Sequence, residues 1–188
     1  IARMKQQAAA LGVRFRPHVT PTKRAPVAAA QIAAGARGIT VSTLKEADQF
    51  FADGVTDILY AVGMAAHRLD HALALRRRGC DLKIITDSRD GARAIADFGR
   101  RHGEAFEVLI EIDTDGHRSG IRPEENALLD IGHVLHDGGM RLGGVLTHAG
   151  SSYELNTPAA LAALAEQERA GCVQAAERLR AAGLPCPV

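Results

Sequence analysis

Side chains that can exchange protons stand at the ends of several short apolar runs in this sequence. His18 ends the first of these runs and is followed closely by Thr20 and Lys23, and His148 ends a later run just ahead of Tyr153. A histidine changes its charge near neutral pH, so His148 at a strand end suits proton transfer, while a buried, hydrogen-bonded structural histidine is the alternative. These residues indicate a site for a small molecule if the fold brings the ends of the runs together.

Short β-branched runs alternate along the chain with longer Ala-, Leu- and Arg-rich stretches of helical period. The sequence predicts strands over 14–19, 38–42, 57–63, 81–87, 107–113 and 142–148, with a seventh opening near Pro187. It predicts helices over 25–34, 44–52, 65–78, 91–102, 124–136 and 158–182. Thr43 to Glu46 fits a capping box at the start of one of these helices. Such alternation predicts an α/β fold with a parallel sheet.

Two arrangements of such a sheet are open, a doubly wound sheet and a (β/α)8 barrel. Arg16-Pro17-His18-Val19 leads into Thr20-Pro21-Thr22-Lys23 with no Gly-rich phosphate loop, so we favour the TIM-type (β/α)8 barrel. Six strands and the start of a seventh leave this barrel truncated at its C-terminal side, because the fold requires eight. Chemistry in such barrels collects at the C-terminal ends of the strands, so the polar run ends are expected to share one mouth.

Composition excludes several classes of protein. Apolar residues make up 46% and charged residues 24% of the 188, which is typical of a globular domain. Lys and Arg number 23 against 22 Asp and Glu, and this balance gives no support to a nucleic-acid or membrane partner. No apolar run approaches the ~20 residues that span a bilayer. Three widely spaced cysteines do not form a disulfide framework, which favours a reducing, cytoplasmic location.

Five sequence strings occur in the order and context seen in one enzyme family. They cover residues 16–19, 35–41, 57–63, 111–121 and 148–153. On these strings the chain resembles the D-threonine aldolase / D-serine dehydratase family. These are fold-type III pyridoxal-phosphate (PLP) enzymes with an alanine racemase-like N-terminal barrel. The likeness runs along nearly the whole chain.

The resemblance implies a function and a domain organisation. Residues 1–188 are expected to form an incomplete PLP-binding barrel domain, and the C-terminal β domain of the family is absent from this sequence. The implied activity is that of a lyase on D-amino acids, by retro-aldol cleavage of D-threonine-type substrates or dehydration of D-serine. An amino-acid racemase is the alternative enzyme. The resemblance also implies a homodimer, a small D-amino-acid substrate, and a divalent metal bound by the absent β domain, so no metal ligand is expected here.

The sequence departs from the family at the residue that should form the imine with PLP. The family string places a lysine directly after the residue that matches Val19, and an ungapped match puts Thr20 there. Threonine cannot form an imine. Three interpretations stay open: the chain is a non-catalytic PLP-binding relative; Lys23 has taken over the role; or a cofactor-modified lysine between Val19 and Thr20 is missing from the printed sequence.

The remaining candidates take their roles from the same resemblance. Arg118 is expected to bind the phenolic oxygen of the cofactor ring, with a surface pair to Asp113 or Asp115 as the alternative. His148 is expected next to the ring, and Tyr153 is expected to contact substrate or cofactor. The other cofactor-side candidates, at the first and third strands, are Arg16, His18, Thr20 and Tyr60.

Overall fold

In a computed structural model of the protein, residues 1–22 and 24–187 are described. They divide into two compact units. Unit 1 contains the described residues of Ile1–Val62 and Asp70–Lys83, and unit 2 contains Gly63–Leu69 and the described residues from Ile84 onward. The boundary crosses the chain between Val62 and Gly63, between Leu69 and Asp70, and between Lys83 and Ile84.

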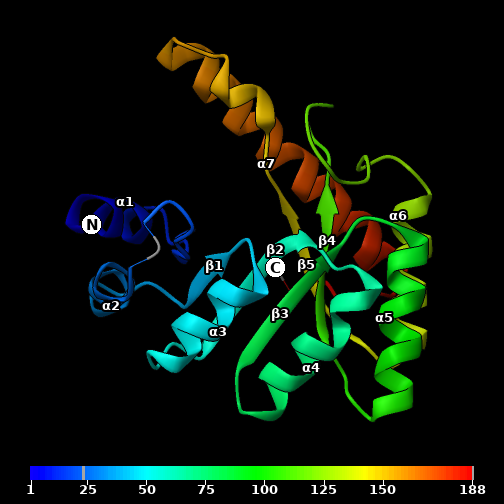
Figure 1. Cartoon of the computed structure of the whole chain (residues 1–188). Coiled ribbons are helices and arrows are strands. Elements are labelled where there is room, and N and C mark those ends of the chain that lie inside the picture. The colour runs from blue at the N-terminus through cyan, green and yellow to red at the C-terminus, as the bar shows by residue number, and fades with distance from the viewer. Residues whose placement is uncertain (23, 188) are drawn as a thin grey trace. The chain divides into compact units, whose positions relative to one another are not determined.

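From α2 onward, the described elements alternate between helix and strand, as the sequence predicts (Figure 1). In chain order they are α1 (Ala2–Ala10), α2 (Ala25–Ala33), β1 (Ile39–Val41), α3 (Leu44–Ala52), β2 (Asp57–Gly63), α4 (Leu69–Arg77), β3 (Asp81–Thr86), α5 (Arg89–His102), β4 (Glu107–Ile112), α6 (Ala127–Asp137), β5 (Arg141–Thr147) and α7 (Pro158–Ala181). Two short 3-10 helices, η1 (Ala66–Arg68) and η2 (Gly150–Tyr153), complete the set.

The strands form a five-stranded sheet in the order β1-β2-β3-β4-β5. β1 pairs in parallel with β2, with Val41 opposite Tyr60, and β4 pairs in parallel with β5, with Ile112 opposite Thr147. In a doubly wound sheet the strand order reverses at a switch point, whereas here it follows the chain. The observed order therefore agrees with the predicted barrel-type architecture.

The first predicted strand, over 14–19, is wrong as a regular strand. The segment lies beside β1 and is joined to it by a single parallel bridge, His18 to Thr40. The backbone N–H of Val19 donates to the Thr40 carbonyl at 3.0 Å, and the Thr40 N–H donates to the Pro17 carbonyl at 2.8 Å. Pro17 has no N–H to extend the ladder, which keeps the segment short of a named strand.

The strand predicted near Pro187 is likewise not formed by the described residues. Leu184 to Pro187 carry no strand pairing, and Pro185 and Pro187 offer no N–H to a ladder. Several polar residues assigned to strand ends (Ser42, Asp87, Asp113 and His148) lie just beyond their strands. They belong to the loops that follow the strands, which is where a barrel site would be built.

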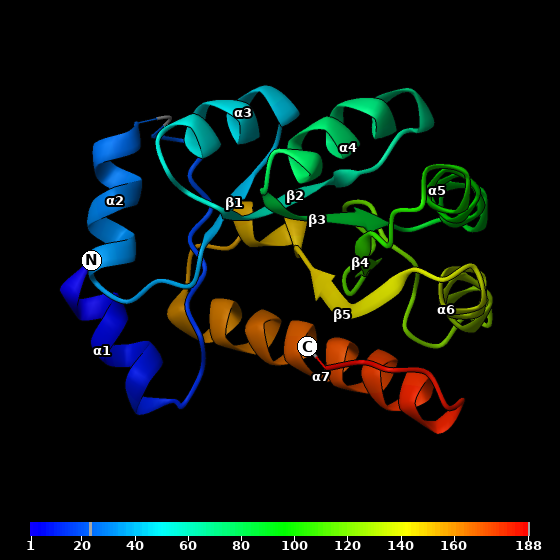
Figure 2. The same cartoon turned by 90° about the horizontal axis from the view of Figure 1, so that it is seen from below.

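The apolar core of unit 2 is formed by aliphatic side chains of the strands. Every residue of β4 after Glu107 is buried, and Ile84, Ile110 and Ile112 have no exposed surface. α5, α6 and α7 lie around β4 and β5, as Figure 2 shows. α7 contacts both strands and α6, so it holds the strands that precede the loops described below. In the described part of the chain, no helix has the length and apolar character needed to cross a membrane.

Candidate functional site

In unit 1, the candidate side chains follow the first extended segment and β1. Pro17 and Val19 are buried while His18 is exposed, so the predicted alternation places Arg16, His18 and Thr20 on the face away from the core. The imidazole Nε2 of His18 lies 3.4 Å from the Ser42 hydroxyl. Thr20 donates its hydroxyl hydrogen to the Glu46 carboxylate at 3.0 Å. The segment that carries His18 and Thr20 is thereby joined to the loop before α3.

The Glu46 carboxylate accepts hydrogen bonds from Thr20 and from the loop before α3. The predicted capping box is confirmed: the Thr43 hydroxyl accepts from the Glu46 N–H at 3.0 Å, and Glu46 Oε2 accepts from the Thr43 N–H at 3.1 Å. The same oxygen accepts from the Ser42 N–H at 3.0 Å and from the Thr20 hydroxyl. The Glu46 residue is only 5% exposed. A helix cap thus also fixes the position of Thr20.

The contacts of the described residues do not assign the amine that an imine to PLP requires. Lys23 lies outside the described residues. Lys83 is engaged elsewhere, at 2.8 Å from Asp57 and 2.7 Å from Asp81. Val19 and Thr22 close a tight turn, with the Thr22 N–H donating to the Val19 carbonyl at 3.1 Å. A lysine directly before Thr20 would extend from this turn.

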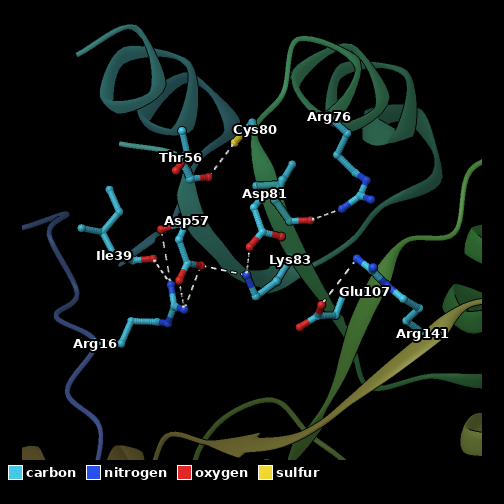
Figure 3. A network of polar contacts seen from close by, with 11 residues as sticks. Arg16, Ile39, Thr56, Asp57, Arg76, Cys80, Asp81, Lys83, Glu107 and Arg141 are labelled. Carbon is cyan, nitrogen blue, oxygen red and sulfur yellow. Dashed lines mark hydrogen bonds and ion pairs between the residues drawn. The ribbon is translucent and has the colours of Figure 1, made fainter. Parts of the chain in front are cut away.

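Arg16 is bound at the opposite end of the strands from this turn. Its guanidinium donates to both carboxylate oxygens of Asp57 at 2.8 Å and to the Ile39 carbonyl at 3.2 Å (Figure 3). Asp57 is the first residue of β2, and Lys83 approaches the same carboxylate. Burial would raise the pKa of Asp57, but hydrogen bonds from Arg16 and Lys83 outweigh it and hold the pKa low. These contacts suit a structural role, and the predicted contact of Arg16 with the cofactor stays a prediction.

Tyr60 is fully buried within β2. The prediction that it lines the mouth of the site stays untested by its contacts.

In unit 2, two loops carry the remaining candidates. The Arg118 loop (residues 113–120) follows β4, and the His148 loop (residues 148–153) follows β5 and contains η2. The Arg118 loop folds back on its strand: the Asp113 N–H donates to the Ile121 carbonyl at 2.9 Å, and the Ile121 N–H donates to the Glu111 carbonyl at 2.9 Å. Gly120, at φ +127°, has its N–H 3.2 Å from the Asp87 carboxylate. The loop is a compact, tethered turn.

Arg118 lies against the His148 loop. A Cβ on Gly150 would come within 2.5 Å of the Arg118 Cγ and 2.8 Å of its Cδ, so only glycine leaves room for that side chain. Within the part of the chain that the structure describes, Arg118 forms no ion pair with Asp113 or Asp115. Asp113 instead accepts from the backbone N–H groups of its own turn, at 3.2 and 2.7 Å. The alternative of a surface pair is therefore not what the structure shows.

His148 and Tyr153 contact each other. The Tyr153 hydroxyl lies 3.3 Å from His148 Nε2, and the ring centroids are 5.8 Å apart. Both residues are exposed, and 75% of Tyr153 is open to solvent. A tyrosine hydroxyl hydrogen-bonded to an imidazole is suited to pass a proton. The prediction that both act at one site is consistent with this pairing.

Sequence reasoning missed a buried acid beside this loop. Glu111 is 8% exposed in β4, and burial raises the pKa of its carboxyl, with Asp87 adding to the rise against a Ser119 hydrogen bond and the Arg118 charge. A charged residue inside an apolar strand was the available signal. It also missed Ser151 and Glu168, whose loop contacts only the tertiary structure reveals. In the described residues no cluster of three or more His, Cys, Asp or Glu side chains is arranged to hold a metal ion.

The donor set suits an aromatic, oxyanion-bearing ligand better than a metal. Unit 2 offers a guanidinium without a carboxylate partner in its loop and an imidazole–phenol pair. Guanidinium groups bind phenolates and phosphates well, and imidazoles exchange protons. The side chains present therefore fit the ring of a pyridoxal.

Fold and site together define an α/β domain with a sequentially ordered parallel sheet and polar loops at the carboxyl ends of its strands. Comparison with known protein families matches residues 4–188 to the alanine racemase N-terminal domain. The chain belongs to this family. Membership implies PLP as the cofactor.

The chain is similar to several individual members of related enzyme groups. D-threo-3-hydroxyaspartate dehydratase of Delftia sp. strain HT23 is 75% identical over 189 residues, covering 100% of this chain and 50% of the relative. Its solved structure superposes with a TM-score of 0.98 over 100% of this chain and 50% of that chain. D-serine dehydratase of Dictyostelium discoideum is 29% identical over 88% of this chain and 45% of the relative. D-threonine aldolase of Arthrobacter is 27% identical over 93% of this chain and 46% of the relative.

The chain spans about half the length of the curated relatives it matches. The activity of the whole protein is therefore treated below as a proposal.

Proposed function

We propose that this chain is the PLP-binding domain of a lyase that removes water from 3-hydroxy D-amino acids. The observation that carries the proposal is 75% identity, along the whole chain, to a D-threo-3-hydroxyaspartate dehydratase. Loss of water from such a substrate gives an enamine, which hydrolyses to a 2-oxo acid and ammonia. PLP, when bound, takes up the electron pair released as the Cα–H bond breaks.

The side chains divide the work of such a site. Arg118 binds the phenolic oxygen of the ring, because its side chain lies against Gly150 and, in the described residues, its guanidinium forms no ion pair with a carboxylate of its own loop. His148, with the Tyr153 hydroxyl at 3.3 Å, moves a proton at the substrate. His18 and Thr20 border the cofactor from the first segment. Arg16 and Tyr60 support that segment and β2 from within unit 1.

We place the missing amine between Val19 and Thr20. The Delftia relative aligns over 189 positions with all of this 188-residue chain, so at least one aligned position has no residue here. A lysine directly before Thr20 would extend from the turn that Val19 and Thr22 close. It would also leave Thr20 as the threonine that follows the lysine in the family string. Lys23 and a truly absent amine are the competing interpretations.

Borohydride reduction of the intact, PLP-loaded protein tests this placement. Reduction fixes an imine covalently, and fragment masses of the tryptic peptide that begins at Phe15 locate the labelled lysine. A label ahead of Thr20, on a peptide that is heavier than the printed sequence by one lysine residue and the reduced cofactor, supports the proposal. A label on Lys23 moves the imine there, and an unlabelled protein without an imine absorbance band leaves only a non-catalytic PLP-binding relative.

A substrate panel tests the reaction. D-threo-3-hydroxyaspartate and D-serine should release ammonia and the corresponding 2-oxo acid. Glycine and an aldehyde from D-threonine would indicate retro-aldol cleavage instead. Interconversion of D- and L-alanine without ammonia release would indicate a racemase, to which this chain is related through its family. The proposed function fails if no D-amino acid is turned over by protein that carries the imine.

Three further properties belong to the same proposal. A divalent metal is bound outside this chain, supported by a solved structure of the Delftia relative that is described as a metal-free form. The protein forms a homodimer, which sedimentation of the intact protein tests. Its location is the cytoplasm, supported by Cys80, Cys172 and Cys186, which are all free thiols in the described chain.

A further inference from the structure

The Arg118 loop and the His148 loop are fastened to each other by Asp115. One oxygen of its carboxylate accepts from the Ser151 N–H at 2.8 Å and from the Ser151 hydroxyl at 2.6 Å. The other oxygen accepts from the His117 N–H at 3.2 Å, within its own loop. Asp115 therefore orders the turn ahead of Arg118 and holds η2 at the same time.

Two neighbouring residues of α7 form hydrogen bonds to the two loops. Glu168 accepts from the Ala149 N–H at 2.9 Å, next to His148. Gln167 donates its side-chain amide to the Thr114 carbonyl at 2.5 Å, next to Asp115. Gly171 permits this approach, since a Cβ there would come within 2.7 Å of the Thr114 methyl group. Glu168 thus contacts the His148 loop, and Gln167 contacts the Arg118 loop.

These contacts surround the candidate site and do not include its reactive groups. Ala149 is 2% exposed, so the N–H that Glu168 accepts is shielded from water. A buried N–H that loses its acceptor raises the free energy of the loop conformation. The conformation of the His148 loop should therefore depend on the contact with Glu168. Arg118 lies on Gly150 between the two fastened positions, Ala149 and Ser151.

From this geometry we propose that Asp115 and Glu168 are positioning residues that lock the two loops into one frame, fixing Arg118 relative to the His148–Tyr153 pair. The proposal rests on the proposed function for what the frame serves. The frame itself is a property of this chain and can be measured with or without PLP. Asp115 and Glu168 act through the loops and not by contact with substrate.

Amide hydrogen exchange on the intact apo-protein tests the frame directly. Glu168→Ala should speed exchange of the Ala149 amide, and Asp115→Ala should speed exchange of the Ser151 amide, each by at least about fivefold, as expected for one lost hydrogen bond. Glu168→Gln keeps an oxygen acceptor and should stay close to the parent protein. Glu166→Ala is the matched control: Glu166 is an exposed residue of the same helix that pairs only with Arg169 in the described contacts.

The consequence for the cofactor is read from the PLP-loaded protein. Glu168→Ala and Asp115→Ala should release PLP roughly fivefold faster and weaken the visible circular dichroism of the bound chromophore, while Glu166→Ala changes neither. Ser151→Ala removes only the hydroxyl donor and gives a milder test if Asp115→Ala fails to fold. Exchange rates in Glu168→Ala and Ser151→Ala that match Glu166→Ala would overturn the frame. Faster exchange in a protein that never binds PLP would keep the frame and reject the proposed function.

Discussion

At the scale of single residues, Glu46 shows how one side chain serves two purposes. It completes the cap of α3 and it accepts the Thr20 hydroxyl, all through one buried oxygen. N-terminal N–H groups of a helix need acceptors, and the carboxylate provides one for Ser42 and Thr43. The position of Thr20, at the end of the first extended segment, therefore depends on the cap of α3.

Glu46→Ala should lower the free energy of unfolding by about 2–3 kcal/mol, because buried N–H groups lose their acceptor. Glu46→Gln keeps an acceptor oxygen and should cost no more than about 1 kcal/mol. Urea denaturation followed by circular dichroism measures both. Equal losses in the two variants would contradict the acceptor role and point to charge alone.

Substitution of Gly150 should affect cofactor binding through Arg118. Gly150→Ala places a methyl group within 2.5 Å of the Arg118 Cγ, so the arginine side chain must move. The neighbour is flexible, so we expect a change in unfolding free energy below about 1 kcal/mol but clearly weaker PLP binding.

Equilibrium titration with PLP, followed by absorbance, measures the Gly150→Ala effect. Gly103→Ala is a control, because a Cβ at Gly103 meets no atom within 4 Å although the left-handed φ of +64° still strains it. PLP affinity that is unchanged in Gly150→Ala would show that Arg118 does not bind the cofactor from this position.

At the scale of the elements, the two ends of the strands in unit 1 carry different chemistry. The amino ends of β2 and β3 hold Asp57, Asp81 and Lys83 in an ion-pair network with Arg16, while the loops at the carboxyl ends hold the candidate site. Gly38, at φ +66°, permits the close approach of Arg16 and Asp57. In barrels of this kind the amino ends provide stability and the carboxyl ends provide function.

The Asp57 network should make unit 1 sensitive to acid. The pKa of Asp57 is held below its ordinary 3.8, so its stabilising contribution is complete above that pH and is lost as the pH falls through the lower folded value. Asp57→Asn should remove about 1–2 kcal/mol near neutral pH, a figure reduced for the partial exposure of the pair. The difference from the parent protein should shrink below about pH 4.

Unfolding free energies of Asp57→Asn and the parent protein, measured between pH 3 and 7, give the result. Asp90→Asn serves as control, because the Asp90 side chain is 94% exposed. A difference between Asp57→Asn and parent that is the same at every pH would refute the titration of Asp57 as its origin.

At the scale of the whole molecule, the predicted cofactor should act as a stabilising ligand. A ligand that binds only the folded protein raises the unfolding free energy by about 2.7 kcal/mol at a hundredfold excess over its dissociation constant. PLP should therefore raise the thermal midpoint of the intact apo-protein. Pyridoxal, which lacks the phosphate, should raise it less, and pyridoxine, which cannot form an imine, isolates the non-covalent part. A thermal midpoint that PLP, pyridoxal and pyridoxine all leave unchanged would argue against a pyridoxal-binding site.

The sequence determined the alternation of strands and helices, because apolar periodicity and caps such as Thr43–Glu46 are local properties of the chain. It also indicated that Arg118 and His148 belong to loops that follow strands, because the apolar runs before them end there. It failed at residues 14–19, where Pro17 limits pairing to a single bridge.

Only the tertiary structure decided which partners these side chains have. Arg16 binds Asp57, 41 positions away, and Glu168 reaches the Ala149 N–H from α7, and neither pairing leaves a periodic or motif signal. The room that Gly150 leaves for Arg118 is likewise a fact of packing. Local patterns fix where a backbone bends and which face is apolar, whereas side-chain partners depend on distances that exist only once distant segments have packed.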